Sequence, residues 1–108
     1  MMDIDGQWCF FREGIEKLRY VIVKLRDFET MTWAEIKVRT GSHSIDVGDI
    51  IPDAWNRLVE IGRDQEDTIF SLRLSGQERV LGIRRDAILH LLWWDPEHRV
   101  CESHLTHT

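Results

Sequence analysis

The chain has 108 residues, of which 43% are hydrophobic and 31% are charged, which is the composition of one small globular domain with one core. Its net charge of −5 differs from the basic excess with which generic nucleic-acid binders neutralise phosphate, although a single face can differ in sign from the whole. The longest apolar run, Ala87–Trp94, is too short to span a bilayer, and the first residues lack the basic-then-apolar order of a secretory signal. We therefore expect a cytoplasmic protein without membrane contact.

The first elements follow from a change of hydrophobic period. Trp8–Phe11 is a short aromatic run bounded by Gly6 and Gly14, and it predicts a first strand. After it the apolar residues recur at steps of three and four, which predicts a helix over Gly14–Phe28. This predicted apolar stripe consists of Ile15, Leu18, Ile22, Leu25 and Phe28.

Two shorter helices are indicated by their end signals. Thr32 and Glu35 match a capping box, so a helix is expected from there to about Val38. Pro52 suits the first turn of the next helix, and Gly62 suits its C-terminal stop. The residues predicted to be buried on this helix are Ala54, Trp55, Leu58, Val59 and Ile61.

From Thr68 to Cys101 the pattern is that of an antiparallel sheet. Side chains alternate over Ile69–Leu74, a second strand follows over Arg79–Arg84, and Ile88–Trp94 is apolar on both faces, as expected of a central strand covered on each side. The separating turns are predicted at Ser75–Glu78, Arg85-Asp86 and Asp95–His98. The sequence therefore predicts a single α+β domain over residues 1–108, with an N-terminal strand and helices packed in two layers on a C-terminal antiparallel meander, and a flexible tail at about 102–108.

The two cysteines, Cys9 and Cys101, lie at opposite ends of the chain and form no CxxC motif. We predict free thiols, with a redox or crosslinking role as the alternative. The sequence contains no phosphate-binding P-loop, dinucleotide fingerprint, HExxH or GxSxG motif, so no cofactor and no metal are expected.

Three arginines of the sheet, Arg73, Arg79 and Arg84, are the first candidates for chemistry. They lie on adjacent predicted strands, and guanidinium groups bind phosphate with paired hydrogen bonds. The alternative is that they face solvent or pair with Glu78 and Asp86.

The histidines near the C-terminus are the second candidates. His98, His104 and His107 lie close together in the sequence, and an imidazole exchanges protons near neutral pH. The alternative is a solvated tail without a role. His90, inside the apolar strand, is expected to be a hydrogen-bonded core residue.

Trp93 and Trp94 are adjacent on one predicted strand, so they point to opposite faces. Packing against the sheet is the simplest interpretation of both indoles. An aromatic shelf that stacks a base or anchors a partner, together with His98, is the alternative.

The stretch Phe70–His98 reads FSLRLSGQERVLGIRRDAILHLLWWDPEH. It resembles a recurring block in small bacterial and mobile-element proteins that have no assigned activity, and the upstream FETMTWAEI resembles part of the same set. This resemblance implies kinship and no particular chemistry.

The chain is also similar, more distantly, to the RelE/ParE class of bacterial toxins. Those proteins open with a strand, continue through helices, and close with an antiparallel meander that carries arginines and a late histidine or tyrosine. The matching positions here are Arg79, Gly82, Arg84, Leu91, Leu92, Trp93, Asp95, His104 and His107. The acidic charge and the long helical part, Gly14–Gly62, depart from the usual pattern of the class.

Two functions follow as hypotheses. The resemblance implies a toxin-type protein of a toxin–antitoxin pair, and one form that such a toxin takes is a metal-independent endoribonuclease. In it Arg73, Arg79 and Arg84 would be the cations, and His104 or His107 the acid or base. The alternative is a non-catalytic protein-binding module of the same fold. The partners expected for these two functions are RNA, an antitoxin or another protein. A third hypothesis is that the chain is a small metabolic enzyme with an unrecognised site.

Overall fold

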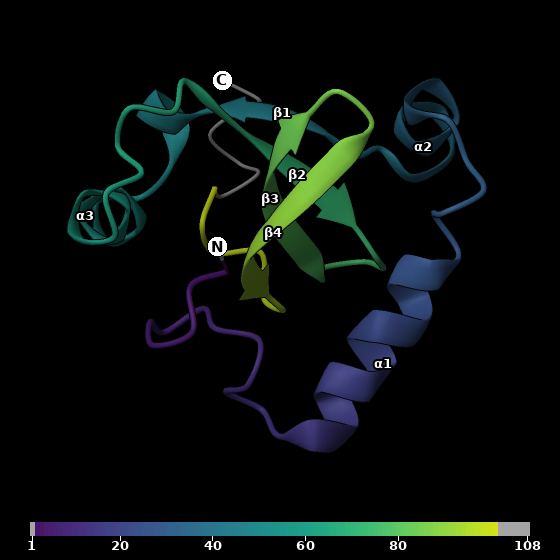
Figure 1. The fold of residues 1–108 in the computed structure, drawn as a ribbon, viewed down its shortest axis with the longest axis horizontal. Coiled ribbons are helices and arrows are strands. Elements are labelled where there is room, and N and C mark those ends of the chain that lie inside the picture. The colour runs from purple at the N-terminus through teal and green to yellow at the C-terminus, as the bar shows by residue number, and fades with distance from the viewer. Residues whose placement is uncertain (1, 102–108) are drawn as a thin grey trace.

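The computed structural model describes residues 2–101 (Figure 1). Its elements, in chain order, are helix α1 (Ile15–Arg26), helix α2 (Trp33–Thr40), strand β1 (His43–Asp46), a short 3-10 turn (Val47–Asp49), helix α3 (Pro52–Glu60), and strands β2 (Thr68–Arg73), β3 (Arg79–Arg85) and β4 (Ile88–Asp95). Helices are segregated from an antiparallel sheet, so the predicted α+β class is confirmed. No helix in this part of the chain has the length and apolar character needed to cross a membrane.

The four strands form one antiparallel sheet in the order β1-β2-β3-β4. The three consecutive strands predicted between Thr68 and Trp94 are confirmed. The prediction that Ile88–Trp94 is central is wrong, because β4 is an edge strand and β2 and β3 are central. The prediction of a first strand at Trp8–Phe11 is also wrong, because these residues form turns. The remaining strand of the sheet is β1, in a segment where the sequence predicts no strand.

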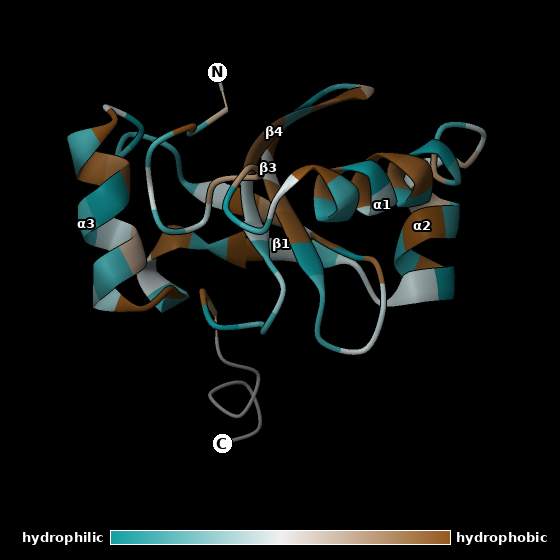
Figure 2. Ribbon diagram, turned by 90° about the horizontal axis from the view of Figure 1, so that it is seen from below, coloured by the Kyte–Doolittle hydropathy of each residue, from teal (hydrophilic) through white to brown (hydrophobic). Residues whose placement is uncertain are grey.

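Helices contact both faces of the sheet, which explains why β4 is apolar on both sides although it lies at an edge. In Figures 1 and 2, α3 lies on one side of the strands, and α1 and α2 lie on the other. Each face has its own core. The α3-side core includes Leu58, Leu81 and Trp93, and the α1-side core includes Val21 and Trp94.

The apolar stripe of α1 is rotated from its predicted position. Val21 is buried, with 1% of its surface exposed, while Ile15 and Ile22 are 74% and 50% exposed. Leu18 and Leu25 pack against the core beside Val21. The helix prediction is confirmed, but the predicted stripe lies half on the sheet and half on an open flank.

We predict that Val21→Ala lowers the free energy of unfolding by about 2 kcal/mol, because a fully buried valine loses most of its transfer energy. Ile22→Ala, one position along the same helix, should change it by less than about 0.5 kcal/mol. Urea denaturation of both variants measures the difference. Equal losses would show that α1 is not oriented as described.

The predicted ends of the two shorter helices are confirmed. The Thr32 hydroxyl accepts a hydrogen bond from the Glu35 N–H at 3.1 Å, and the Glu35 carboxylate accepts one from the Thr32 N–H at 2.9 Å. Pro52 begins α3, and Gly62 follows it with a φ of 74°, a left-handed conformation that favours glycine. On α3 only Ala54 and Leu58 are buried, while Trp55 and Val59 are partly exposed.

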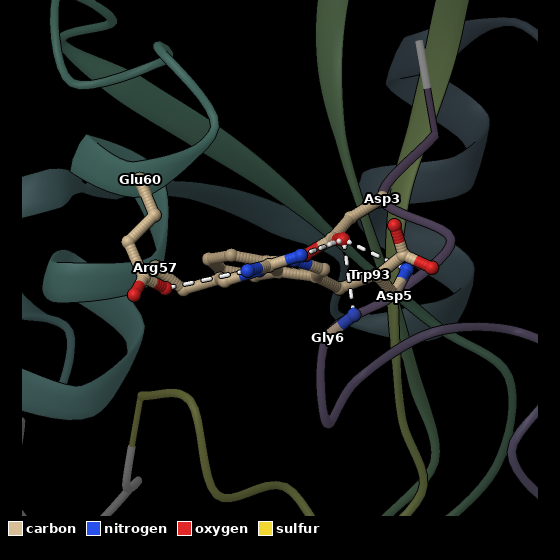
Figure 3. A network of polar contacts seen from close by, with 6 residues as sticks. All are labelled: Asp3, Asp5, Gly6, Arg57, Glu60 and Trp93. Carbon is tan, nitrogen blue, oxygen red and sulfur yellow. Dashed lines mark hydrogen bonds and ion pairs between the residues drawn. The ribbon is translucent and has the colours of Figure 1, made fainter.

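A buried polar network ties the N-terminal segment to α3 and β4 (Figure 3). The Asp3 carboxylate accepts hydrogen bonds from Arg57 Nη2 at 2.7 Å, Arg57 Nε at 2.8 Å and Trp93 Nε1 at 2.9 Å. The Asp5 and Gly6 N–H groups also donate to it. The Asp3 N–H donates to the Leu92 carbonyl at 3.2 Å, so this segment covers part of the outer edge of β4.

Both cysteines are unpaired, as predicted. Cys101 is buried in the α3-side core. Burial, together with the nearby carboxylates of Asp49 and Asp95, raises the pKa of its thiol, which disfavours the reactive thiolate.

Candidate functional site

Two of the predicted arginines lie side by side at one end of the sheet. Arg73 ends β2, Arg79 begins β3, and the two are direct partners across the antiparallel pair. The predicted turn between them forms a hairpin closed by a hydrogen bond from the Leu74 N–H to the Glu78 carbonyl at 2.9 Å. Because directly opposed side chains share a face of a sheet, both guanidinium groups extend from the same surface.

The hairpin orients these two guanidinium groups with neutral acceptors. Arg79 Nη1 donates to the carbonyls of Ser75 at 3.1 Å, Gly76 at 2.9 Å and Glu78 at 3.2 Å. Arg73 Nε donates to the Ser75 carbonyl at 3.3 Å. Within residues 2–101 neither arginine forms an ion pair with a carboxylate. Their positive charges are therefore held in place without being neutralised by direct contact.

The hairpin itself is anchored to α1. The Glu78 carboxylate accepts hydrogen bonds from the Tyr20 hydroxyl at 2.5 Å and the Ser75 hydroxyl at 2.7 Å. Lys17 approaches the same carboxylate at 3.5 Å. These bonds lower the pKa of Glu78 against the opposing effect of its burial. Glu78 thus fixes the loop whose carbonyls hold the arginines, and it does not pair with Arg79 as the alternative interpretation assumed.

His98 belongs to the same end of the sheet. It is the last residue of the predicted Asp95–His98 turn, is half-buried, and has a φ of 57°. Burial lowers the pKa of His98, and the positive charges of Arg79 and Arg73 lower it further. The imidazole is therefore in its neutral form at pH 7, the form that accepts a proton.

Asp95 opposes Arg79 in the sheet, but its carboxylate is occupied elsewhere. It is almost completely buried and accepts hydrogen bonds from the N–H groups of Arg99 and Val100, each at 2.9 Å. This arrangement shapes the turn that carries His98. The negative charge of Asp95 therefore acts on Arg79 and His98 through space, without a direct ion pair among the described residues.

Sequence reasoning missed residues from β1 and α2 that lie near this surface. His43 of β1 is exposed and contributes to the field around His98. Arg39 and Thr40 at the end of α2 line a hollow of about 330 Å³ together with Arg73, Ser75 and Gly76. The short β1 strand gave no clear alternation in the sequence, so nothing in the sequence placed these residues beside β2.

Arg84 is not brought to this surface. It lies near the other end of β3, and its guanidinium carbon is 4.5 Å from the centre of the Trp33 ring and 6.0 Å from that of Phe70. The Trp33 indole N–H also donates to the Asp86 carbonyl at 3.0 Å. Arg84 thus stacks on an aromatic pair of the α1-side core face.

The structure does not bring the other predicted residues that it describes to this surface. Trp93 and Trp94 are 0% and 1% exposed and lie in opposite cores, so packing is their role and neither offers a free ring face. His90 is exposed and is not the expected core residue, because β4 is an edge strand. His104 and His107 lie outside the described residues.

Within residues 2–101 no three histidine, cysteine or carboxylate side chains are grouped to hold a metal ion. Comparisons of the chain with protein-family models, curated proteins and solved structures found no match. The candidate site, which we call the Arg–His surface, is therefore defined by its own geometry: Arg73, Arg79 and His98, with His43 and Arg39 beside them.

Proposed function

We propose that the Arg–His surface binds a phosphate of RNA and that the chain is a toxin-type ribonuclease similar to the RelE/ParE class, acting in the bacterial cytoplasm. The observation that carries the proposal is the cross-strand pair Arg73 and Arg79, preorganised by hairpin carbonyls and free of carboxylate partners in the described chain. Preorganised cations stabilise developing phosphorane charge without further rearrangement.

The chemistry needs a base, cations and an acid. Neutral His98 would accept the proton of the 2′-hydroxyl as the 2′-oxygen attacks the adjacent phosphorus. The bond from phosphorus to the 5′-oxygen then breaks, which leaves a 2′,3′-cyclic phosphate and a 5′-hydroxyl. A second histidine would protonate the departing 5′-oxygen: His43 is near the surface, and His104 and His107 are the candidates from the tail.

The net charge of −5 does not oppose this proposal. Phosphate binding depends on the local potential, and three arginines, Arg39, Arg73 and Arg79, lie around the same end of the sheet. Burial and the neighbouring Arg73 lower the pKa of Arg79, yet an arginine keeps its charge at every working pH.

We predict that induced expression of the chain arrests bacterial growth and that the purified protein leaves 2′,3′-cyclic phosphate ends on RNA. Arg79→Ala should lower the cleavage rate by roughly a hundredfold, because one charged contact in the transition state is lost. Arg19→Ala, on the exposed side of α1, is the matched control and should cleave at the wild-type rate. Absence of both growth arrest and cleavage would refute the ribonuclease proposal.

A non-catalytic protein-binding module of the same fold is the second candidate function. The observation that favours it is an apolar groove beside the outer edge of β4, on a different part of the molecule from the Arg–His surface. In a toxin–antitoxin pair, an antitoxin would be the natural partner for such a module. A chain that leaves growth and RNA intact but binds a protein would support this function instead.

A further inference from the structure

The outer edge of β4 is only half covered. The N-terminal segment hydrogen-bonds to it at Leu92, and the Trp94 N–H donates to the Trp8 carbonyl at 2.7 Å. Among residues 2–101, the backbone of Ile88–Leu91 forms hydrogen bonds only with its partner strand β3. This stretch therefore presents unpaired donors and acceptors in the geometry that accepts another strand.

An apolar groove borders this open edge. It has a volume of about 690 Å³ and lies between the end of α1, the start of α2 and β4. Its lining is mostly apolar, with Leu89 and Leu91 from β4, Leu72 from the central strand β2, Phe28 from the segment after α1, and Trp33 from α2 among the lining residues.

Further apolar side chains outside the groove lining are exposed on α1 and β4. Ile15 and Ile22 project from the side of the helix next to Leu18 and Leu25, and they are half or more exposed. Ile88 at the start of β4 is 60% exposed. An apolar groove next to an unpaired strand, with Ile88 exposed at the start of that strand, indicates a binding surface for a partner.

A negative charge in the groove lining indicates which charge a bound segment should carry. Among residues 2–101, Glu29 is the only charged residue that lines the groove. A lysine or arginine of a bound segment would therefore find an opposite charge at Glu29.

We infer that the groove and the open edge of β4 bind an extended segment of a partner protein, which adds a strand to β4. The segment carries apolar side chains at alternate positions, which enter the groove, and a lysine or arginine at the end near Glu29. Main-chain hydrogen bonds supply general affinity in this mode, and the alternate side chains supply selectivity. The surface is separate from the Arg–His surface, so the inference stands whether or not the chain cleaves RNA.

The test uses the full chain and a blocked hexapeptide, Arg-Val-Thr-Val-Thr-Val, with calorimetry for affinity and amide hydrogen exchange for location. Binding should slow exchange in Ile88–Leu91. N-methylation of one alternate set of peptide amides should abolish binding, while methylation of the other set leaves it intact, because only every second amide of an added strand faces its neighbour.

Two protein variants complete the design. Met31→Ser, at a half-buried residue that lines the groove, should weaken binding about tenfold through the loss of one apolar contact. Val23→Ser, at an exposed apolar residue of α1 that does not line the groove, should not. Glu29→Lys should reverse the preference between the peptide and its Glu-Val-Thr-Val-Thr-Val counterpart.

Three outcomes would overturn the inference. Equal sensitivity to both methylation patterns would indicate a helix or a small apolar ligand. Self-association of the chain through β4, lost in Met31→Ser but not in Val23→Ser, would indicate a second copy. Absence of peptide binding with unchanged exchange in Ile88–Leu91 would show that the edge is not a docking site.

Discussion

Asp3→Asn is expected to lower the free energy of unfolding by about 3 kcal/mol, because removal of one partner from a buried ion pair leaves the other charge without compensation. The carboxylate accepts hydrogen bonds from both Arg57 and Trp93, and its side chain is 2% exposed. Arg57 is 24% exposed and retains some solvation, which keeps the expected loss at the lower end for such pairs. Chemical denaturation measures it.

Asp5→Asn is the matched control, since Asp5 is exposed and contributes only its backbone N–H to the same network. Its substitution should change the free energy of unfolding by less than about 0.5 kcal/mol. A loss in Asp5→Asn equal to that in Asp3→Asn would contradict the network.

The same network predicts an acid response. Hydrogen bonds from Arg57 hold the pKa of Asp3 far below its usual range. A carboxylate with a lowered pKa in the folded state stabilises the fold at every pH above its unfolded pKa of about 3.9, and this contribution is lost as the pH falls further. Stability should therefore fall below about pH 4 in the wild type, and less steeply in Asp3→Asn.

Gly82→Ala is the second substitution with a large expected effect. A Cβ atom at this position would lie 2.6 Å from the backbone carbonyl oxygen of His90 and 2.8 Å from Leu89 Cδ1. Backbone cannot move aside as a side chain does, so the β3–β4 pairing would be displaced at the bulge between Leu81 and Gly82. We expect a loss of about 2–3 kcal/mol in the free energy of unfolding.

Gly76→Ala provides the comparison, because no heavy atom lies within 4 Å of the corresponding Cβ position. It should be close to neutral in a thermal melt. If Gly82→Ala melted at the wild-type temperature, the close approach of β4 to Gly82 would be refuted.

Local signals in the sequence predicted most of the fold correctly. The capping box at Thr32, the proline that begins α3 and the hairpin turns act within a few residues, so their outcome depends little on the rest of the chain. The apolar run of β4 predicts a strand covered on both faces, which the structure shows, and a central position, which it does not. Whether a strand is covered on both faces and whether it lies inside the sheet are separate properties. The position of a strand in the sheet depends on pairing between distant segments, which the local sequence does not show.

The candidate site was predictable only in part, for the same reason. Arg73 and Arg79 flank a short hairpin, so their pairing follows from local geometry. Strand adjacency in the sequence also predicts Arg84 at this site, but Arg84 lies near the other end of β3 and stacks on Trp33. His43 lies at the surface because its strand, β1, pairs with β2, although α3 separates the two strands in the sequence. Hydrophobic periodicity does not reveal such a contact between distant segments.

The placement of Asp3 has a consequence for biosynthesis. Its hydrogen bond to Trp93 joins residues 90 positions apart, and Glu13 reaches Trp94 across 81 positions. A ribosome makes the N-terminal segment early and β4 late, so the nascent chain cannot close either core until β4 has left the exit tunnel. Such long-range closure slows folding, and until then the exposed Trp8 and Phe10 would be natural targets for a chaperone.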